Sequence, residues 1–396
     1  MSVDKILTLL KFSGCEIISE VELYELLKSK KDLVIKVGFD PTAERLHLGH
    51  VVLLRQLRLF QQFGYRISFL IGDFTAMIGD PSGRSDSRKQ ITRDVIVNNF
   101  KTYTEQIFKI LDVNLTTIYF NSSWLNNLSI NSFINLMSSM TVSRLIERND
   151  FKSRYVINKP IYLHEFIYPL LQAYDSIFMN ADIEFGGIDQ KFNFLLTRNL
   201  QKKFGYVSQV VIMMPILKGI DGKNKMSKSL HNCINIDDDF YDMFCKIMSI
   251  PDSIVKDYYI FLNFLTTSEY DVLFSNHHNF MTLKLDLACR IVSLLYDVNL
   301  ADKAKFKFIN YFSKKNIFDD IDVSFFSIES NNILLSDFLV KFKFVLTYSE
   351  FKRLLKSGSI SINSSVIKDR NFILEINIDY FIRLGKKKAF KAFISY

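Results

Sequence analysis

The sequence predicts an α/β protein in which a parallel-sheet domain is followed by a helical domain and a small α+β domain. Three observations support this order. Strand and helix patterns alternate through roughly the first 230 residues, which is typical of a parallel sheet covered by helices. From about residue 230 to 330 the pattern is mostly helical and contains few glycines. The remaining residues combine two short helical patterns with alternating strands.

In the first part, short β-branched runs alternate with stretches that have apolar residues at helical spacing. Gly64 follows the first long helical stretch as a stop signal. Ligands of open parallel sheets bind beyond the carboxyl ends of the strands, so functional residues are expected directly after these strands. The predicted elements are a strand at 34–37, a helix at 48–63, a strand at 67–71, a helix at 92–111 and a buried strand at 207–214.

The second part begins with three aspartates at 237–239 that can cap a helix, and the helix is predicted at 240–250. No clear strand run follows up to about residue 330, and the segment 319–332 is polar, irregular and expected to contain a linker. After it, helices are predicted at 335–344 and 349–357, then Gly358 and alternating strands. The predicted domains are therefore 1–229, 230–330 and 333–396.

Composition excludes several classes of protein. Of the 396 residues, 48% are hydrophobic and 23% are charged, which excludes a disordered chain, a collagen-like chain and a small disulfide scaffold. The four cysteines lie far apart without a CxxC pair, so a reducing compartment is expected. Residues 1–20 lack the apolar core of a signal peptide, and the apolar stretch 204–217 is too short to span a bilayer. We therefore expect a cytoplasmic protein without a membrane segment.

The net charge of +8 is concentrated near the C-terminus. Residues 333–396 hold twelve Lys and Arg against five Asp and Glu, so this part alone carries +7. A basic module predicts an anionic partner, commonly nucleic acid, and the alternative is a basic surface that only solvent contacts. Clustered bases contact phosphates without reading sequence. The candidate nucleic-acid-binding residues are Lys352, Arg353, Lys356, Lys386, Lys387 and Lys388.

The segment 38–50 reads Gly-Phe-Asp-Pro-Thr-Ala-Glu-Arg-Leu-His-Leu-Gly-His and joins the first strand to the first long helix. A helix start presents free N–H groups and the positive end of the helix dipole, which suit a phosphate group. His47 and His50 add hydrogen-bond donors, and Gly49 allows a nucleotide to approach the backbone closely. The alternative is a capped helix start with two surface histidines. A zinc site is not indicated, because neither a helical HExxH nor cysteine partners accompany the pair.

A second segment, 225–229, reads Lys-Met-Ser-Lys-Ser and is predicted to lie on a mobile loop next to glycines. Lys225 and Lys228 on such a loop can close over a polyphosphate and neutralise the charge that develops as pyrophosphate leaves. Taken alone, a loop rich in Lys and Ser is usually only solvated. Its presence in one chain with His47 and His50 favours a nucleotide site.

These two segments together resemble the paired signatures of the class I aminoacyl-tRNA synthetases, and the residues between them narrow the resemblance to tyrosyl-tRNA synthetase. The resemblance covers residues 34–232, and order and spacing agree throughout. The C-terminal module resembles the S4 RNA-binding domain, whereas 230–330 matches the anticodon-binding region of the family by position only. The further matching segments are the GFDP turn at 38–41, the GDPSG loop at 79–83, the amino-acid-reading helix at 168–175 and the GGxDQ loop at 186–190.

The resemblance implies a Rossmann-like catalytic domain and the activity of a tyrosine–tRNA ligase. Such an enzyme activates tyrosine with ATP, which yields tyrosyl-adenylate and pyrophosphate, and then transfers tyrosine to the 3′ end of tRNA(Tyr). The resemblance also implies ATP as a substrate, Mg²⁺ on the ATP phosphates, no metal held tightly by the protein, and a homodimer. No residue of the sequence is an obvious general base for the transfer step.

Tyr168, Gln172 and Asp175 are spaced four and three residues apart, so they share one helix face. This pattern favours an amino-acid pocket over a core, and the alternative is a solvated surface helix. The resemblance implies that Tyr168, Gln172 and Asp80 hold the α-ammonium group and that Asp175 accepts the phenol hydroxyl. Phenylalanine would leave Asp175 unpaired and should be rejected. The implied tyrosine-binding residues are Gly38, Asp80, Tyr168, Gln172, Asp175 and Gln190; the implied ATP-binding residues are Asp40, Thr42, His47, Gly49, His50, Gly187, Asp189 and Lys228; the implied catalytic residues are His47, His50, Lys225, Lys228, Arg84 and Arg88.

Lys36 departs from the resemblance, because many members of the family have a tyrosine there that also contacts the phenol. Lys36 either makes that contact or points elsewhere, so tyrosine specificity is expected to depend more strongly on Asp175. Three other functions stay open: a tryptophanyl-type ligase, a nucleotidyltransferase and a non-catalytic RNA-binding protein. Asp175 and the S4-like module argue against the first, the segment 225–229 argues against the second, and the two intact signatures argue against the third.

Overall fold

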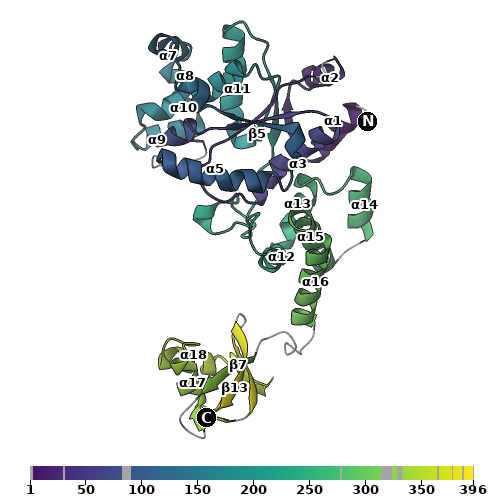
Figure 1. Ribbon diagram of the computed structural model, residues 1–396, viewed down its shortest axis with the longest axis vertical. Coiled ribbons are helices and arrows are strands. Elements are labelled where there is room, and N and C mark those ends of the chain that lie inside the picture. The colour runs from purple at the N-terminus through teal and green to yellow at the C-terminus, as the bar shows by residue number, and fades with distance from the viewer. Residues whose placement is uncertain are drawn as a thin grey trace. The chain divides into compact units, whose positions relative to one another are not determined.

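The computed structural model describes residues 3–29, 32–82, 91–276, 279–313, 323–327, 332–363, 365–376, 378–385 and 388–395. Contacts between residues divide the chain into two compact units, Met1–Lys305 and Phe306–Tyr396. Figure 1 shows the helices and strands of both units. The division into three domains that the sequence suggests stays a prediction.

The larger unit is built on a six-stranded sheet whose strands lie in the order β1 (Glu16–Ile18), β6 (Val210–Met214), β5 (Ile183–Gly187), β2 (Ile35–Phe39), β3 (Ile67–Ile71) and β4 (Thr116–Phe120). β1 runs antiparallel to β6, and all other neighbours are parallel. The chain proceeds from β2 to β3 and β4 on one side, and β5 then pairs with β2 on the other side. The strand order thus reverses between β2 and β5, and a ligand crevice is expected outside the carboxyl ends of these strands.

Helices lie on both sides of these strands (Figure 1). Helix α10 (Leu163–Phe178) packs its apolar residues Leu170, Leu171 and Ile177 with Leu70 of β3 in a shared core cluster. The hydrogen-bonding residues Tyr168, Gln172 and Asp175 of this helix are therefore held close to the sheet. The helices before β6 are α1 (Val3–Phe12), α2 (Glu20–Ser29), α3 (Leu48–Gln62), α4 (Thr75–Ile78), α5 (Arg93–Ile107), α6 (Ser122–Leu125), α7 (Ile130–Met137), α8 (Val142–Ile146), α9 (Asn149–Val156), α10 (Leu163–Phe178) and α11 (Lys191–Lys203), with short 3₁₀ turns η1 (Val113–Leu115) and η2 (Ile188–Gln190).

Residues after β6 form the helical region that the sequence predicts. Asp239 caps its first helix by accepting the backbone N–H groups of Tyr241 and Asp242, which confirms the predicted cap. In the described part of the chain, no helix is long and apolar enough to cross a membrane. The helices are α12 (Phe240–Met248), α13 (Val255–Phe261), α14 (Thr267–Asn276), α15 (Phe280–Leu295) and α16 (Val298–Ser313), with the 3₁₀ turns η3 (Lys228–Leu230) and η4 (Asp252–Ile254).

The structure confirms the long elements that the sequence predicts in the parallel sheet. The strands at 34–37, 67–71 and 207–214 correspond to β2, β3 and β6, and the helices at 48–63 and 92–111 correspond to α3 and α5. The strands β1, β4 and β5 are not predicted by the sequence pattern. β5 includes Gly186 and Gly187, which the sequence suggests only as part of a loop motif, so this motif begins at the end of a buried strand.

The smaller unit has its own core. Its helices α17 (Leu335–Lys341) and α18 (Tyr348–Lys356) match the two that the sequence predicts. Buried apolar side chains from both helices and from the sheet, including Leu335, Phe351 and Ile382, form one cluster. The strands are β10 (Ser365–Val366), β9 (Ile360–Ile362), β12 (Asp379–Leu384), β13 (Lys388–Ser395) and β7 (Val323–Ser327) in the order of the sheet, and a separate pair of β8 (Asn332–Leu334) and β11 (Ile373–Glu375).

One sequence interpretation is wrong in this unit. The segment 319–332 was predicted to be irregular, but Val323–Ser327 within it is strand β7, which runs parallel to β13. Its Val-Ser-Phe-Phe-Ser composition suits a strand. The run is short, however, and its pairing partner lies near the C-terminus, so no local pattern indicates the pairing.

Candidate active site

A cavity of about 680 Å³ lies at the carboxyl ends of β2, β5 and β6, where the strand order reverses. The segments that line it are far apart in the sequence and are brought together by the sheet. Arg84 and Arg88, predicted to contact pyrophosphate, lie outside the described residues. The other residues predicted for catalysis, tyrosine binding or ATP binding all line the cavity: Gly38, Asp40, Thr42, His47, Gly49, His50, Asp80, Tyr168, Gln172, Asp175, Gly187, Asp189, Gln190, Lys225 and Lys228.

The two histidines lie at the start of α3. The backbone N–H of His47 donates to Nδ1 of His50 at 3.2 Å, and the two rings lie 4.0 Å apart between centroids. Burial, which removes water from a charged imidazole, lowers the pKa of His47 to about 2 and that of His50 to about 4. Both rings are therefore neutral at pH 7. Because Nδ1 of His50 accepts a hydrogen bond, its proton is on Nε2, where it can be donated to an anion.

The lysine segment is joined to the start of α3 by backbone contacts. His47 forms a β-bridge with Asn235, and the Leu48 N–H donates to the Ile234 carbonyl at 2.9 Å. These contacts hold the residues after the segment 225–229 beside the histidines. The two signatures seen in the sequence are thus parts of one site.

Asn232 holds the lysine segment in shape. Its Oδ1 accepts the Ser227 N–H at 2.8 Å, and its Nδ2 donates to the Lys225 carbonyl at 3.1 Å. Nζ of Lys225 lies 3.7 Å from Oδ2 of Asp189, and burial lowers the pKa of Lys228. The segment predicted as a mobile loop therefore has a defined internal hydrogen-bond network, which presents both lysines to the cavity.

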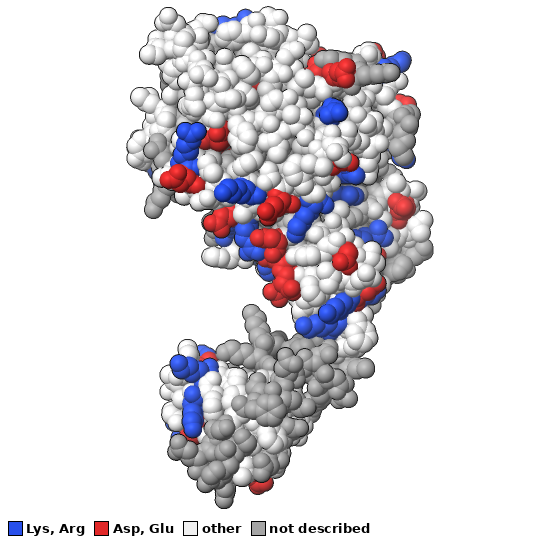
Figure 2. Space-filling view, in the orientation of Figure 1, with Lys and Arg blue, Asp and Glu red and all other residues white. Residues whose placement is uncertain are grey.

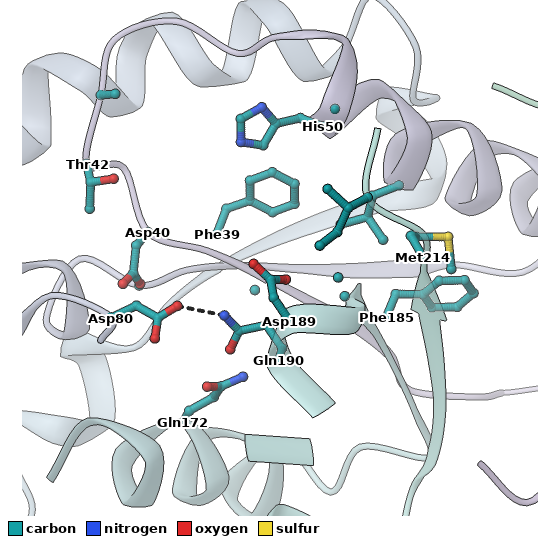
Figure 3. A pocket seen from close by; sticks show the side chains of 18 of the residues that line it. Phe39, Asp40, Thr42, His50, Asp80, Gln172, Phe185, Asp189, Gln190 and Met214 are labelled. Carbon is teal, nitrogen blue, oxygen red and sulfur yellow. Dashed lines mark hydrogen bonds between the residues drawn. The ribbon is translucent and has the colours of Figure 1, made fainter. Parts of the chain in front are cut away.

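Asp80, Gln172 and Gln190 form a polar wall of the cavity. Nε2 of Gln190 donates to Oδ2 of Asp80 at 2.6 Å, the hydrogen bond drawn in Figure 3. Nδ2 of Asn193 donates to Oε1 of Gln172 at 2.7 Å and to Oε1 of Gln190 at 2.9 Å. Figure 3 shows Gln172 extending from its helix toward Gln190, with Asp80 beside them and Asp40 beyond. The wall concentrates oxygen acceptors, which suits an ammonium group.

Arg148 supports this wall from within the protein. Its side chain is buried, Nη1 donates to Oδ1 of Asn193 at 3.1 Å, and Nη2 donates to Oγ of Ser82 at 2.5 Å. Nη2 also lies 3.7 Å from Oδ1 of Asp80, and Ser82 donates its hydroxyl to the same oxygen at 2.6 Å. Arg148 and Asn193 belong to no motif, and the sequence does not indicate either.

Asp175 lies at the buried end of the cavity. Nε1 of Trp124 donates to its Oδ1 at 2.8 Å, and Nδ2 of Asn121 donates to its Oδ2 at 3.1 Å. Burial raises the pKa of Asp175 to about 6, against the opposing effects of Lys36 and of these two hydrogen bonds. The carboxylate is ionised at pH 7 and each oxygen has one donor. The sequence does not predict the partners, although Trp124 is the single tryptophan of the chain.

Asp40 links two walls of the cavity. The Tyr168 hydroxyl donates to Oδ2 of Asp40 at 2.9 Å, and the Thr75 hydroxyl donates to Oδ1 at 2.8 Å. A Cβ at Gly72, directly after β3, would collide with both Asp40 and Thr75. Glycine is therefore required at this position for the carboxylate of Asp40 to approach β3.

Lys36 takes part in a buried ion pair. Its side chain is 1% exposed, and its Nζ lies 2.7 Å from Oε1 of Glu184 on the neighbouring strand β5. Nζ also donates to Oγ of Ser176 at 2.6 Å. Both Lys36 and Glu184 line the inner part of the cavity. Of the two possibilities that the sequence left open for Lys36, the structure shows a side chain engaged with Glu184.

The basic residues of α18 are exposed on the smaller unit. Lys352, Arg353 and Lys356 project from a helix whose Phe351 is buried in the core. Figure 2 shows Lys and Arg side chains gathered along the edge of this unit where Figure 1 places α17 and α18. Lys386 and Lys387 lie outside the described residues, as does the side chain of Lys388 at the start of β13.

Comparison with known proteins gives consistent relatives. The family model of class I tRNA synthetases (W and Y) matches residues 28–313. A tyrosine–tRNA ligase of Aquifex aeolicus is 44% identical over 391 residues, which cover 99% of each chain. A tyrosine–tRNA ligase of Legionella pneumophila is 44% identical over 382 residues, which cover 96% of this chain and 95% of the relative.

Solved structures agree with the fold. The tyrosyl-tRNA synthetase of Archaeoglobus fulgidus, solved with L-tyrosine, has a TM-score of 0.62 at 24% identity and covers 77% of this chain and all of its own. A C-terminally truncated mitochondrial tyrosyl-tRNA synthetase of Coccidioides posadasii has a TM-score of 0.63 at 22% identity and covers 76% of this chain and 91% of its own. At these identities the similarity concerns the fold.

Proposed function

Because the chain belongs to the class I tRNA synthetases of the W and Y family and, within them, to the tyrosine–tRNA ligases, we propose that its cavity is divided into a tyrosine half and an ATP half. The enzyme activates tyrosine with ATP and transfers it to tRNA. One observation carries the assignment of residues. Fifteen residues predicted for catalysis, tyrosine binding or ATP binding converge on one cavity at the reversal point of the sheet.

In the tyrosine half, Asp175 would accept the phenol hydroxyl. Its oxygens each have one donor, from Trp124 and Asn121, and a carboxylate oxygen can accept a second hydrogen bond. Phenylalanine would bring no donor to this buried carboxylate, and such a loss costs about 1–3 kcal/mol, more for a charged group. At the other end, Asp80 and Gln172 would hold the α-ammonium, with Tyr168 beside them. Gly38 would lie between these two ends of the tyrosine half. A Cβ added at Gly38 would meet no atom within 4 Å, so this part of the cavity is open.

In the ATP half, the phosphates would lie at the start of α3. The positive end of the helix dipole favours an anion there. Neutral His50 would donate from Nε2, and Lys225 and Lys228 would approach from the segment joined to it. Asp189, at the end of β5, would bind the ribose hydroxyls. Asp40, Thr42, Gly49 and Gly187 would complete this half.

Mg²⁺ would arrive with the nucleotide. Within the described ranges, no group of three His, Cys, Asp or Glu side chains is arranged to hold a metal ion. Mg²⁺ commonly binds substrate phosphates and keeps several waters rather than filling an all-protein site, so this cavity suits a cation carried by ATP. Bound there, it would neutralise part of the phosphate charge.

Activation needs positioning and charge stabilisation rather than a covalent enzyme intermediate. The tyrosine carboxylate attacks the α-phosphorus in line, and pyrophosphate leaves with a growing negative charge. His50 donates a hydrogen bond from a neutral ring, while Lys225 and Lys228 supply positive charge where that anion develops. Arg84 and Arg88 are proposed to contact the same group. The terminal adenosine hydroxyl of the tRNA then attacks the carbonyl of the adenylate, so that the tyrosyl ester forms and AMP leaves.

We propose that the smaller unit binds the tRNA and is an S4-like RNA-binding domain covering 333–396. The support is the +7 charge of 333–396 and the exposed bases of α18. Structured RNA is recognised mainly by shape and by phosphate contacts, which such a surface provides. The helices within 230–330 would contact the anticodon, and residues 1–229 would form the catalytic domain.

A homodimer in the cytoplasm completes the proposal. Exposed apolar side chains gather on the short helices α7 and α9 and the residues after them, including Ile130, Ile134, Tyr155, Val156 and Ile157. Apolar side chains grouped on a surface mark interaction sites. None of the four cysteines is joined in a disulfide, which suits a reducing compartment. Sedimentation analysis and cell fractionation test the two points.

The activity is tested by amino-acid-dependent ATP–pyrophosphate exchange, with tyrosine, phenylalanine and tryptophan tested separately. Exchange with tyrosine alone is the expected result. Exchange with tryptophan instead would reassign the pocket, and no exchange in folded protein would leave only RNA binding.

Two variants test the assignment of the halves. Lys228→Ala should lower kcat for exchange about 10²–10³-fold, because it removes a charge that stabilises the transition state. Asp175→Ala should lower kcat/KM for tyrosine by at least about tenfold, because it removes the acceptor of the phenol. Lys223→Ala is the matched control. Lys223 is an exposed lysine next to the segment 225–229, and Lys223 itself does not line the cavity. Equal activity in all three variants would contradict the assignment.

A further inference from the structure

The centre of strand β2 carries a lysine that is almost completely buried. Nζ of Lys36 has three acceptors: Oε1 of Glu184 at 2.7 Å, Oγ of Ser176 at 2.6 Å and, more weakly, the carbonyl of Gln172 at 3.5 Å. Glu184 in turn accepts the hydroxyl of Ser176 at 2.9 Å and the side-chain amide of Gln209. All the hydrogen-bonding capacity of the ammonium group is used inside the protein.

Net stability does not explain the Lys36–Glu184 pair. Both side chains are at most 2% exposed, and the cost of removing two charges from water commonly equals or exceeds their attraction. Two apolar residues of similar volume would fill the same space on neighbouring strands. The pair lines the inner wall of the substrate cavity, so its two charges act on the other groups of that cavity.

Helix α10 connects the pair to Asp175. Gln172, Asp175 and Ser176 occupy one stretch of this helix, and the first and last of them contact Nζ of Lys36. Asp175 thus lies between two residues that the lysine contacts, and it lines the same cavity. The positive charge of Lys36 lowers the pKa of Asp175, and the negative charge of Glu184 raises it.

Other charged or titratable groups also line this cavity. Asp40 comes from the end of β2, Asp80 from the loop after α4, and the Tyr168 hydroxyl from α10. Both additional carboxylates are negative when ionised, so Lys36 is the cation that the described structure provides close to Asp175 in this wall. Its single positive charge offsets part of the two negative charges of Asp175 and Glu184.

Resting on the function proposed above, we propose that the buried Lys36–Glu184 pair is a positioning element for amino-acid specificity, in which Lys36 keeps Asp175 ionised as the acceptor of the tyrosine hydroxyl and Glu184 holds Lys36 below the pocket. Lys36 does not contact the substrate in this role. Lys36 acts on the binding of the phenol only through the charge of Asp175.

The two members of the pair act on Asp175 with opposite signs, and this separates the proposal from a purely structural role. Glu184→Gln removes a negative charge and keeps Lys36, so Asp175 should ionise more readily. The double variant Lys36→Met/Glu184→Gln removes both charges and leaves a neutral, similarly sized pair. Because the effect of Lys36 outweighs that of Glu184 on Asp175, ionisation should then become harder. Loss of packing alone would affect both variants in the same direction.

The experiment measures KM and kcat for tyrosine in ATP–pyrophosphate exchange between pH 5.5 and 8.5, at saturating ATP. The apparent pKa of the acid limb should move down in Glu184→Gln and up by about one pH unit in the double variant. A shift of one unit from about 6 raises KM about twofold at pH 7 and about fivefold at pH 6, with little change in kcat. Lys11→Met/Glu20→Gln, which removes an exposed ion pair of 2.6 Å in the same unit, is the control and should leave the profile unchanged.

The outcomes are distinguishable from failure of the proposed function. If the wild-type protein shows no tyrosine-dependent exchange, the proposed function fails before the variants are compared. If it exchanges normally and the two variants move the acid limb in the same direction, or not at all, the positioning role of Lys36 is overturned. Circular dichroism and thermal unfolding of each variant verify that the compared proteins are folded. Opposite shifts with near-constant kcat support the proposal.

Discussion

Asp175 carries its charge at an almost fully buried position, and the residues around it determine whether that charge persists at neutral pH. Burial raises its pKa to about 6, and Lys36, Asn121 and Trp124 limit the rise. A carboxylate with a pKa near 6 is mostly ionised at pH 7 but becomes protonated in mildly acidic solution. The proposed acceptor for the tyrosine hydroxyl is thus available only above a defined pH.

The first prediction concerns pH. The wild-type kcat/KM for tyrosine in the exchange reaction should fall on the acid side with an apparent pKa of about 6, because protonated Asp175 no longer accepts as a carboxylate. His47 and His50, with pKa values of about 2 and 4, are already neutral in this range and should not contribute. Asp175→Asn should lack this limb. A limb that persists in the variant would assign the titration to another group.

The second prediction concerns Trp124. Replacement by Phe keeps an aromatic ring but removes the N–H that donates to Asp175 at 2.8 Å. Loss of a hydrogen bond to a charged group corresponds to about 1.5–3 kcal/mol, so kcat/KM for tyrosine should fall about ten- to hundredfold at pH 7. The acid limb should also move to higher pH. Tyr174→Phe, on the same face of the fold but outside the cavity lining, is a control, and equal losses in both variants would indicate general repacking.

For individual residues, the sequence indicates those that belong to motifs. It does not indicate the residues that hold the motif side chains in position through hydrogen bonds. Asp175 and Gln172 follow from helical spacing within a motif, and both line the cavity. Trp124, Asn193 and Arg148 come from other segments and reach the site only through the fold. Side-chain hydrogen bonds between distant segments have no periodicity or spacing, so one sequence cannot reveal them. The role of Lys36 was left open for the same reason, because its partner Glu184 lies on a different strand.

Among the elements, the segment 225–229 depends on Asn232 for its shape. Asn232 is buried and bonds to the backbone on both sides of Met226, and a Cβ at Gly219 would collide with it. The close packing of Asn232 against Gly219 explains why a short loop can hold two lysines in one arrangement. This arrangement places them toward α3, where the phosphates are proposed to bind.

The third prediction is that Asn232→Ala lowers kcat for exchange about ten- to hundredfold, because small displacements of catalytic groups have costs of this size. KM for tyrosine should change little, since the tyrosine half does not contact Asn232. Asn224→Ala is a matched control, because Asn224 is an exposed asparagine of the same loop whose side chain donates to Asp221. Unchanged kcat in Asn232→Ala would mean that the lysines need no preformed segment.

Elements were predictable where their pattern is local and long. The apolar spacing of α3 and the largely apolar run of β3 indicated both elements with nearly correct ends. β4 alternates half-buried and exposed residues at the sheet edge, which makes a weak pattern. β7 was missed entirely because its partner β13 is remote in the sequence. Sheet order, which creates the crevice between β2 and β5, is likewise a property of pairing and is not written in any single segment.

At the scale of the whole molecule, the excess positive charge and the candidate catalytic residues belong to different units of the chain. The cavity and all described catalytic candidates belong to the larger unit, whereas 333–396 holds +7 of the total +8. Electrostatic attraction to a polyanion does not require the cavity, and amino-acid activation does not require the basic surface. The two activities should therefore be separable by mutation.

The fourth prediction tests this separation with Lys352→Ala/Arg353→Ala/Lys356→Ala on α18. The three side chains are exposed, so stability should change little and tyrosine-dependent exchange should remain at the wild-type rate. Transfer of tyrosine to tRNA should show a higher KM for tRNA. The slope of log affinity against log salt should become shallower by about two to three. Each phosphate contact releases counterions on binding, so fewer are released when three contacts are lost. Lys368→Ala/Arg370→Ala, two exposed bases of the same unit outside α18, should have a smaller effect on both measures. If the triple variant binds tRNA with unchanged affinity and salt dependence, the basic face of α18 is only solvated, and the tRNA contacts must lie on another surface of the chain.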